Sequence, residues 1–187
     1  VFNGDGYSDT WQIEAAERGL PNLTTTLDPL PELVKADAVE VFEKYGVFNA
    51  RELESRVEVR YEMYALTVAV EAKLTLEVGS TVVLPAAIRY QTELASNVAT
   101  LKAAGMEPEL TLLQAVSTPI SELTGALTAL KEAMAAHGGD SAAEEAAHAQ
   151  SLLPLMDAVR AAADTLEGVV ADDLWPLPTY QEMLYIL

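Results

Sequence analysis

Few residues of this chain could do chemistry, and the first to consider surround its two histidines. Glu144 and His148 stand four residues apart, a spacing that puts both on one face of a helix, and His137 and Asp140 precede them. Imidazole and carboxylate groups are ordinary zinc ligands. The spacing alone does not bring three ligands together, and the solvated start of a helix produces the same pattern. We therefore expect a helix start and assign no metal ligand here.

The N-terminal segment has part of the pattern of a calcium-binding loop. With Gly6 at the obligatory sixth position, oxygen-bearing side chains fall on positions three, five and nine, namely Asn3, Asp5 and Asp9. The same register puts Val1 where the first carboxylate belongs and Gln12 where a bidentate glutamate is needed. A glycine-shaped turn leading into a helix is the favoured interpretation.

Catalysis by a nucleophile or by an acid/base pair has no candidate either. The chain has no cysteine, and none of its serines or threonines stands beside a plausible base in a recognisable motif. The adjacent acid pairs Glu144–Glu145 and Asp172–Asp173 are typical of solubilising charge. We assign no catalytic, cofactor-binding or metal-binding residue to this chain.

Composition restricts the partners and the compartment. Eleven Lys and Arg against twenty-nine Asp and Glu give a net charge of −18, which disfavours nucleic acid and anionic membranes. No apolar run reaches the roughly 18 residues of a membrane span, and the start lacks the pattern of a signal peptide. Without cysteine there is no disulfide framework, so a cytoplasmic location is expected. The start at Val1, without Met, suggests a piece of something longer, and processing of the N-terminus is the alternative.

The elements that must position these residues are predicted to be helices throughout. Residues 1–48 form a turn-rich lead-in with short helices at 10–18 and 38–45. Asp9 with Gln12 has capping-box spacing for the first helix, and Glu14 with Arg18 is an i,i+4 pair within it. Gly19 and Gly46 suit the residue that follows a helix.

A very long helix is predicted from residue 50 to 104. Asn49 with Glu52 forms a capping signal, and an apolar face follows at Leu53, Val57, Tyr61, Tyr64 and Val68. Residues 56–64 and 70–78 also alternate with period two, so a β-hairpin turning at Gly79 is the alternative. Pro85 is expected to kink the helix, and charges within 51–62 are expected to pair along it, Glu52 with Arg56 and Arg51 with Glu54.

Two further helices carry apolar seams with alternating steps of three and four. They comprise Leu113, Val116, Ile120, Leu123, Leu127, Leu130 and Met134, then Ala149, Leu152, Met156, Val159, Ala163, Leu166 and Val170. Gly138–Gly139 separates them, and Ser141 with Glu144 caps the second. We predict an all-α fold, a bundle of about three long helices over residues 49–174, with bends at Pro119 and Pro154.

Residues 175–187 form a tail rich in proline and aromatic residues. After Pro176 and Pro178, Thr179 with Glu182 has the spacing that restarts a helix. The apolar end, residues 184–187, is expected to dock on this chain or on a neighbour.

Together these motifs resemble the C-terminal region of type III glutamine synthetases. The resemblance covers nearly the whole chain and depends on Phe2–Ser8 with Trp11, Glu17–Leu20, Asn22–Leu23, Val47–Phe48, Glu52–Leu53, Ser55–Arg56, Glu71–Ala72, Leu84–Ala86 with Tyr90, Leu174–Pro176 and Pro178–Tyr180. It implies a parent enzyme that joins glutamate and ammonia with ATP and Mg²⁺ or Mn²⁺, as a ring-shaped homo-oligomer. The catalytic groups would then lie upstream, so this segment would be inactive alone and would contact the remainder of its chain and neighbouring subunits. A free-standing helical interaction module without enzymatic activity is the alternative.

Overall fold

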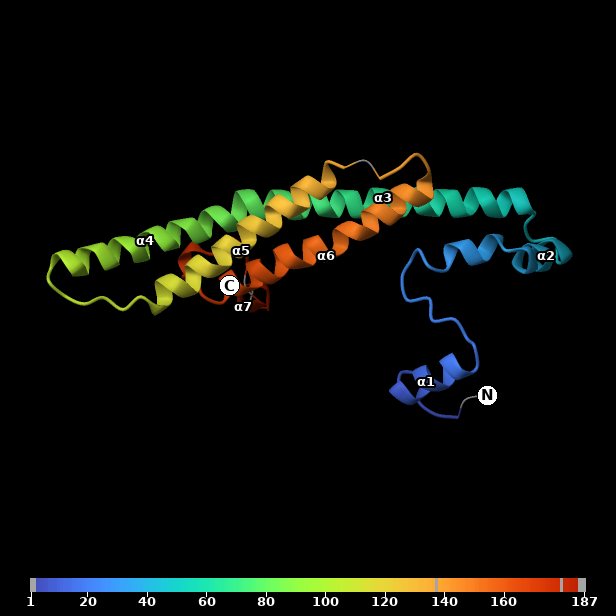
Figure 1. Ribbon diagram of the computed structural model, residues 1–187, viewed down its shortest axis with the longest axis horizontal. Coiled ribbons are helices and arrows are strands. Elements are labelled where there is room, and N and C mark those ends of the chain that lie inside the picture. The colour runs from blue at the N-terminus through green and yellow to red at the C-terminus, as the bar shows by residue number, and fades with distance from the viewer. Residues whose placement is uncertain (1–2, 137, 179, 185–187) are drawn as a thin grey trace. The chain divides into compact units, whose positions relative to one another are not determined.

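The computed structural model describes residues 3–136, 138–178 and 180–184, and this described part is helical without any strand (Figure 1). Its α-helices are α1 Asp9–Glu17, α2 Ala36–Lys44, α3 Ala50–Val78, α4 Leu84–Ala103, α5 Thr111–Met134, α6 Ala142–Glu167 and α7 Tyr180–Leu184. Short 3₁₀ helices lie at Leu30–Val34 and Asp172–Leu174. The all-α prediction is confirmed, and the hairpin alternative for residues 56–84 is wrong. The chain forms two compact units, residues 1–61 and 62–187, which are described separately.

The first unit begins with a turn that feeds α1. Ser8 caps this helix, because its hydroxyl oxygen accepts a hydrogen bond from the Trp11 N–H at 3.4 Å. The cap predicted at Asp9 is therefore one residue late, and Asp9 is instead the first helical residue. The predicted ion pair between Arg18 and Glu14 is present. Gly19 has a φ of 69°, the left-handed conformation expected after a helix.

The turn between α2 and α3 is held by capping and aromatic contacts. The Asn49 N–H donates to a Glu52 carboxylate oxygen at 2.9 Å, and the Glu52 N–H donates to the Asn49 side chain at 3.0 Å, which confirms the predicted capping box. The Arg56 guanidinium lies 4.2 Å from the centre of the Phe48 ring, a cation–π contact. Within the described residues Arg56 makes no ion pair with Glu52, so that prediction is wrong: the cap already uses the carboxylate.

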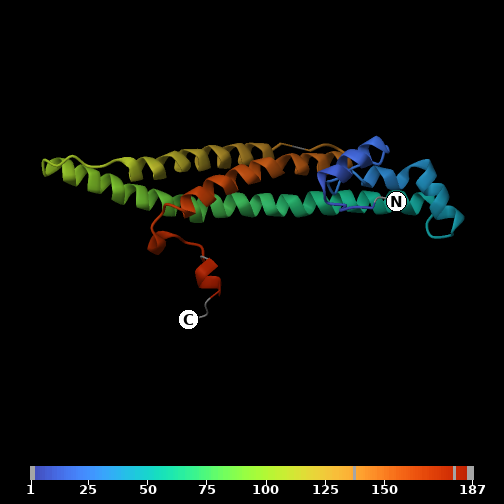
Figure 2. The same cartoon turned by 90° about the horizontal axis from the view of Figure 1, so that it is seen from below.

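The long helix from 50 to 103 contains one irregular stretch that its sequence did not lead us to predict. Residues Gly79–Val83 form a π-helical segment joining α3 to α4, and the helix axis bends there in Figures 1 and 2. Pro85 lies in the first turn of α4. Proline has no N–H to donate and its ring crowds the carbonyl four residues earlier, so a wider turn just before it relieves both problems. The expected kink is present, and it falls in the turn before the proline.

The core of the second unit lies where α5 and α6 run side by side in opposite directions. Buried residues from both predicted seams meet there, Leu123, Leu127 and Leu130 on α5 with Ala149, Leu152, Val159 and Leu166 on α6. The long helix adds Val68, Ala72, Val83 and Ala87 to the same region. Pro119 and Pro154 lie inside α5 and α6 without ending them. Within this unit, the predicted packing of the α5–α6 pair on the long helix is confirmed.

The tail packs against this core at its beginning. Leu174 and Trp175 lie against the core cluster, and the 3₁₀ helix that contains Leu174 contacts α4. Farther along, the Leu184 side chain is 75% exposed, so it does not dock on this chain as expected. The predicted cap at Thr179 and the docking of residues 185–187 lie outside the described residues.

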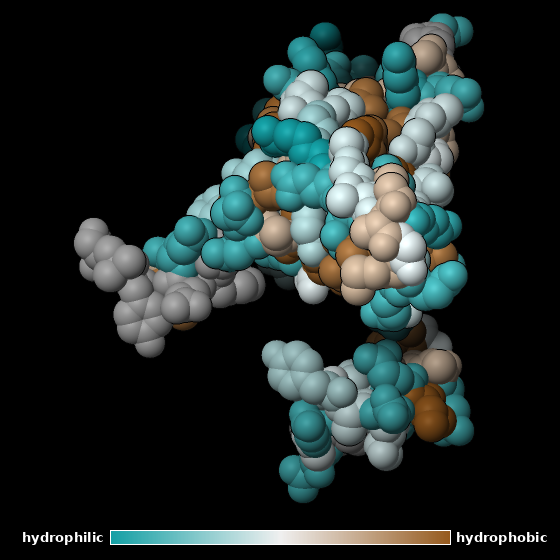
Figure 3. All heavy atoms as spheres, turned by 90° about the vertical axis from the view of Figure 1, so that its left-hand side faces the viewer, coloured by the Kyte–Doolittle hydropathy of each residue, from teal (hydrophilic) through white to brown (hydrophobic). Residues whose placement is uncertain are grey.

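The outer surface is dominated by polar groups on the face seen in Figure 3, where hydrophobic side chains appear as separate patches. No helix within the described ranges is long and apolar enough to cross a membrane. The domain boundaries after residues 48 and 174 stay predictions.

Candidate functional site

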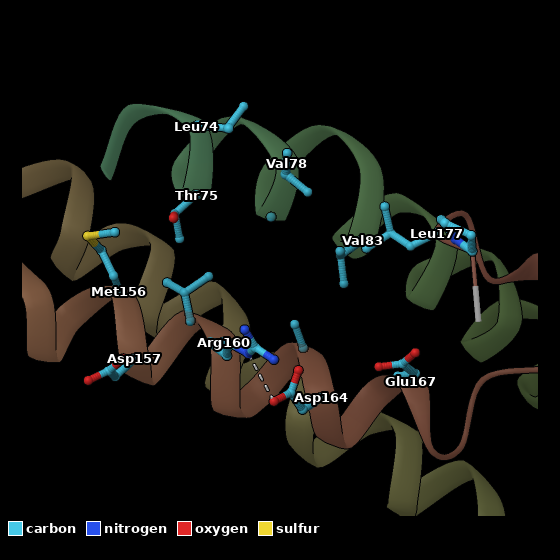
Figure 4. Close-up of a pocket in the computed structure, with 14 residues that line it drawn as sticks. Leu74, Thr75, Val78, Val83, Met156, Asp157, Arg160, Asp164, Glu167 and Leu177 are labelled. Carbon is cyan, nitrogen blue, oxygen red and sulfur yellow. Dashed lines mark hydrogen bonds and ion pairs between the residues drawn. The ribbon is translucent and has the colours of Figure 1, made fainter. Parts of the chain in front are cut away.

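A groove of about 550 Å³ lies in the second unit between the long helix and α6. One wall comes from the end of α3 and the π-helical segment, and the other from successive turns of α6 (Figure 4). Leu177 and Pro178 of the tail also line it. In Figure 4, Thr75 and Val83 are directed toward α6, whereas Leu74 is directed away from it.

The groove combines apolar walls with a charged edge on α6. Arg160 Nε donates to an Asp164 carboxylate oxygen at 3.3 Å, and both side chains are largely exposed. Asp157 and Glu167 lie on the same edge. Thr75 supplies a hydroxyl, but no histidine is among the described residues that line the groove, so Thr75 has no base there. This set of groups suits apolar contact with a charged rim, not bond-breaking chemistry.

Gly79 lies in the wall of the groove, on the π-helical segment. A Cβ at this position would lie 2.7 Å from Cδ2 of Leu127 and 3.4 Å from Cγ1 of Val159, so any other residue here would force the Leu127 side chain to shift. From the sequence we considered a hairpin turn here. A lone glycine in a helical stretch shortly before a proline is a common setting for a bulge. This pattern, at Gly79 and Pro85, could have predicted the close contact between the π-helical segment and its neighbouring helices.

Among the described residues, the candidate zinc ligands Asp140, Glu144 and His148 are not placed as a set that could hold a metal ion. The Glu144 carboxylate accepts hydrogen bonds from Ser141 N–H at 3.1 Å, from Ser141 Oγ at 3.0 Å and from Asp140 N–H at 3.0 Å. The Glu144 carboxylate therefore forms part of the predicted capping box at the start of α6. His148 instead lines a small cavity of about 150 Å³ together with Glu145. His137 lies outside the described residues.

These cap hydrogen bonds also set the ionisation of Glu144. The Ser141 hydroxyl, followed by the Ser141 and Asp140 backbone N–H groups, lowers the pKa of the Glu144 carboxyl below its ordinary value. Donors that favour the ionised form explain the shift, so it reports helix capping and gives no sign of catalysis.

The candidate calcium residues form a turn. An Asp5 carboxylate oxygen accepts from the Tyr7 N–H at 2.9 Å, and the Asp5 carbonyl accepts from Ser8 Oγ at 2.7 Å. Gln12, in the position of the missing bidentate ligand, accepts a hydrogen bond from the Asn22 side chain at 3.2 Å. The favoured interpretation, a turn leading into a helix, agrees with these contacts.

Divalent metal ions need several convergent carboxylate or imidazole groups. Within the described ranges, no group of three or more His, Cys, Asp or Glu side chains is placed to hold one. The residues present thus do not fit a bound metal, and we derive no reaction step from them.

The class that fold and site define is a helical-bundle segment with a surface groove. The chain matches the family model of the glutamine synthetase C-terminal domain over residues 1–102 and belongs to that family. The resemblance inferred from the sequence motifs is thereby confirmed.

Three curated relatives match along nearly the whole chain. They are the type-3 glutamine synthetase of Dictyostelium discoideum, 32% identical, and the glutamine synthetases of Bacteroides fragilis (strain YCH46), 29% identical, and Butyrivibrio fibrisolvens, 31% identical. The alignments cover 98–100% of this chain but only 27–28% of each relative. The chain therefore spans little more than a quarter of the length of these relatives, at their C-terminal end.

Proposed function

We propose that this chain is the C-terminal helical structural module of a type III glutamine synthetase. Its bundle shapes the subunit and supplies contacts to the remainder of its own chain and to neighbouring subunits of a homo-oligomer. The observation that carries the proposal is the family match over residues 1–102, on a chain whose relatives bear the name glutamine synthetase.

In this proposal the parent enzyme joins glutamate and ammonia to make glutamine at the expense of ATP, with Mg²⁺ or Mn²⁺, in the cytoplasm. The groups that bind these reactants belong to the parent's other segments. The absence of a convergent ligand set among the described residues supports a structural role for this module. Its acidic surface, with a net charge of −18, also fits a part that does not hold the anionic nucleotide.

The decisive experiment compares the parent chain with a version that ends before Ala50. The sequence encoded upstream of Val1 defines the parent and should contain an ATP-dependent ligase region. We expect the intact parent to form glutamine as a homo-oligomer, and the shortened one to give smaller particles in light scattering. An open reading frame that starts at this segment, without a ligase region, would contradict the proposal and favour a free-standing interaction module.

A further inference from the structure

The long helix carries an apolar stripe that no described residue of the second unit covers. It consists of Met63, Leu66, Val70 and Leu74, whose side chains are 63%, 67%, 59% and 58% exposed. Steps of three and four residues keep all four on one face, and the inward face carries the buried Val68 and Ala72. Four large apolar side chains in a continuous row are more than the scattered exposure that monomers usually show.

The charges beside this stripe have an arrangement that suits a second copy of the same helix. Glu62 and Lys73 are separated by about three turns, so both flank the stripe on the same side, one near each end. Neither forms an ion pair within the described part of the chain. A helix that bears opposite charges at the two ends of one flank is complementary to itself when turned end for end.

We propose that this stripe, Met63–Leu66–Val70–Leu74, binds the same stripe of a second copy, with the two α3 helices antiparallel. Centred between Leu66 and Val70, this alignment sets Leu66 opposite the partner's Val70 and Met63 near the partner's Leu74. The same register brings Glu62 beside the partner's Lys73, and the two-fold symmetry repeats each contact. One register therefore satisfies the apolar and the charged groups together.

The size of the stripe determines how strongly the two copies are expected to bind each other. Twelve residues rise about 18 Å along a helix, and a pair of helices in contact over that length buries less than the roughly 1,200 Å² of a stable interface. The net charge of −18 on each copy also opposes association. We expect weak dimers of the isolated chain, strengthened in a homo-oligomer by the other contacts between subunits. The inference extends the assembly part of the proposed function and rests on it for the parent enzyme.

Charge reversal tests the register. Sedimentation velocity of the 187-residue chain, over a concentration series at about 0.15 M salt, should show a reversible monomer–dimer equilibrium. K73E sets Glu62 of each copy beside a glutamate of the other, so two pairs of like charges form. The dimer dissociation constant should then rise about tenfold, and the double variant E62K/K73E should restore it. K131E, at an exposed position of α5, changes the net charge equally and serves as the control. A monomer at every concentration, or equal weakening by K73E and K131E, would overturn the proposal.

Cross-linking tests the geometry, helped by the absence of cysteine from this chain. Thr67 is exposed beside the centre of the stripe, so T67C should form dimers with a short bis-maleimide, whereas S96C on exposed α4 should not. The same T67C cross-link should join subunits of the parent protein. If T67C stays uncross-linked there, another part of the parent covers the stripe and the inference is wrong. Glutamine formation is measured separately, so failure of the ligase proposal is recognised on its own.

Discussion

At the scale of single residues, Gly79 is a position with almost no free space. A larger side chain must push into Leu127 and Val159, so Gly79→Val should lower the free energy of unfolding by about 1–3 kcal/mol. Gly125, on α5, has no neighbouring atom within 4 Å of the place a Cβ would take, and Gly125→Ala should raise the free energy of unfolding by about 0.5–1 kcal/mol through helix propensity. Urea unfolding of both variants checks the prediction. Equal effects of the two substitutions would contradict the close approach.

Two substitutions of Trp175 distinguish the contribution of its ring to stability from that of its indole N–H. The ring packs against the core, but its Nε1 atom is buried without a hydrogen-bond partner among the described residues. Trp175→Ala should cost about 2 kcal/mol of stability. Trp175→Phe keeps most of the apolar contact and removes an unsatisfied donor, so it should cost less than half as much. Chemical denaturation distinguishes these outcomes, and equal losses would show that the N–H has a needed partner.

At the scale of the element, the start of α6 should be sensitive to acid. The pKa of Glu144 is lower in the folded chain than its ordinary value of 4.5, so its ionised form stabilises the fold. This contribution is present in full above the ordinary value and disappears as the pH falls through the lowered pKa. The stability difference between the natural chain and Glu144→Gln should therefore shrink below about pH 4.5.

The hydroxyl of Ser141 provides the control for this titration. Ser141→Ala removes the first of the donors that lower the pKa of Glu144, together with the N-terminal cap, and should cost about 1 kcal/mol. In that background the acid-dependent difference produced by Glu144→Gln should become smaller. Thermal melting of the natural chain, both single variants and the double variant across the acid range provides the measurement. A difference that stays constant with pH would show that the cap does not set the ionisation.

At the scale of the whole molecule, we predict that the purified 187-residue chain has no ligase activity. The described residues offer neither a set of metal ligands nor a nucleophile with its base, and the chain spans only 27–28% of its relatives. A coupled assay of ADP release, with glutamate, ammonia, ATP and Mg²⁺, should give the rate of a blank. Glutamine formed by this chain alone would refute the prediction, and the parent enzyme serves as the positive control.

The amino-acid sequence was sufficient for the helices and their buried faces. Apolar steps of three and four residues specified the stripes of α5 and α6, and the capping residues Asn49 and Ser141 marked two helix starts. These signals act within one or two turns, so they can be read locally. The family was also accessible from the motifs near both ends of the chain, because these are unusual in type and spacing.

Tertiary packing decided what local signals left open. Residues 70–78 satisfy both a strand and a helix period, and burial of Ala72 in the core with α5 and α6 selects the helix. The π-helical segment at Gly79 exists because Pro85 cannot continue the regular bonding and the neighbouring helices need a close approach. Which side chains meet across the groove, and which apolar row is left uncovered on α3, depends on distances between segments far apart in the chain. No local pattern contains those distances, so only the folded structure determines them.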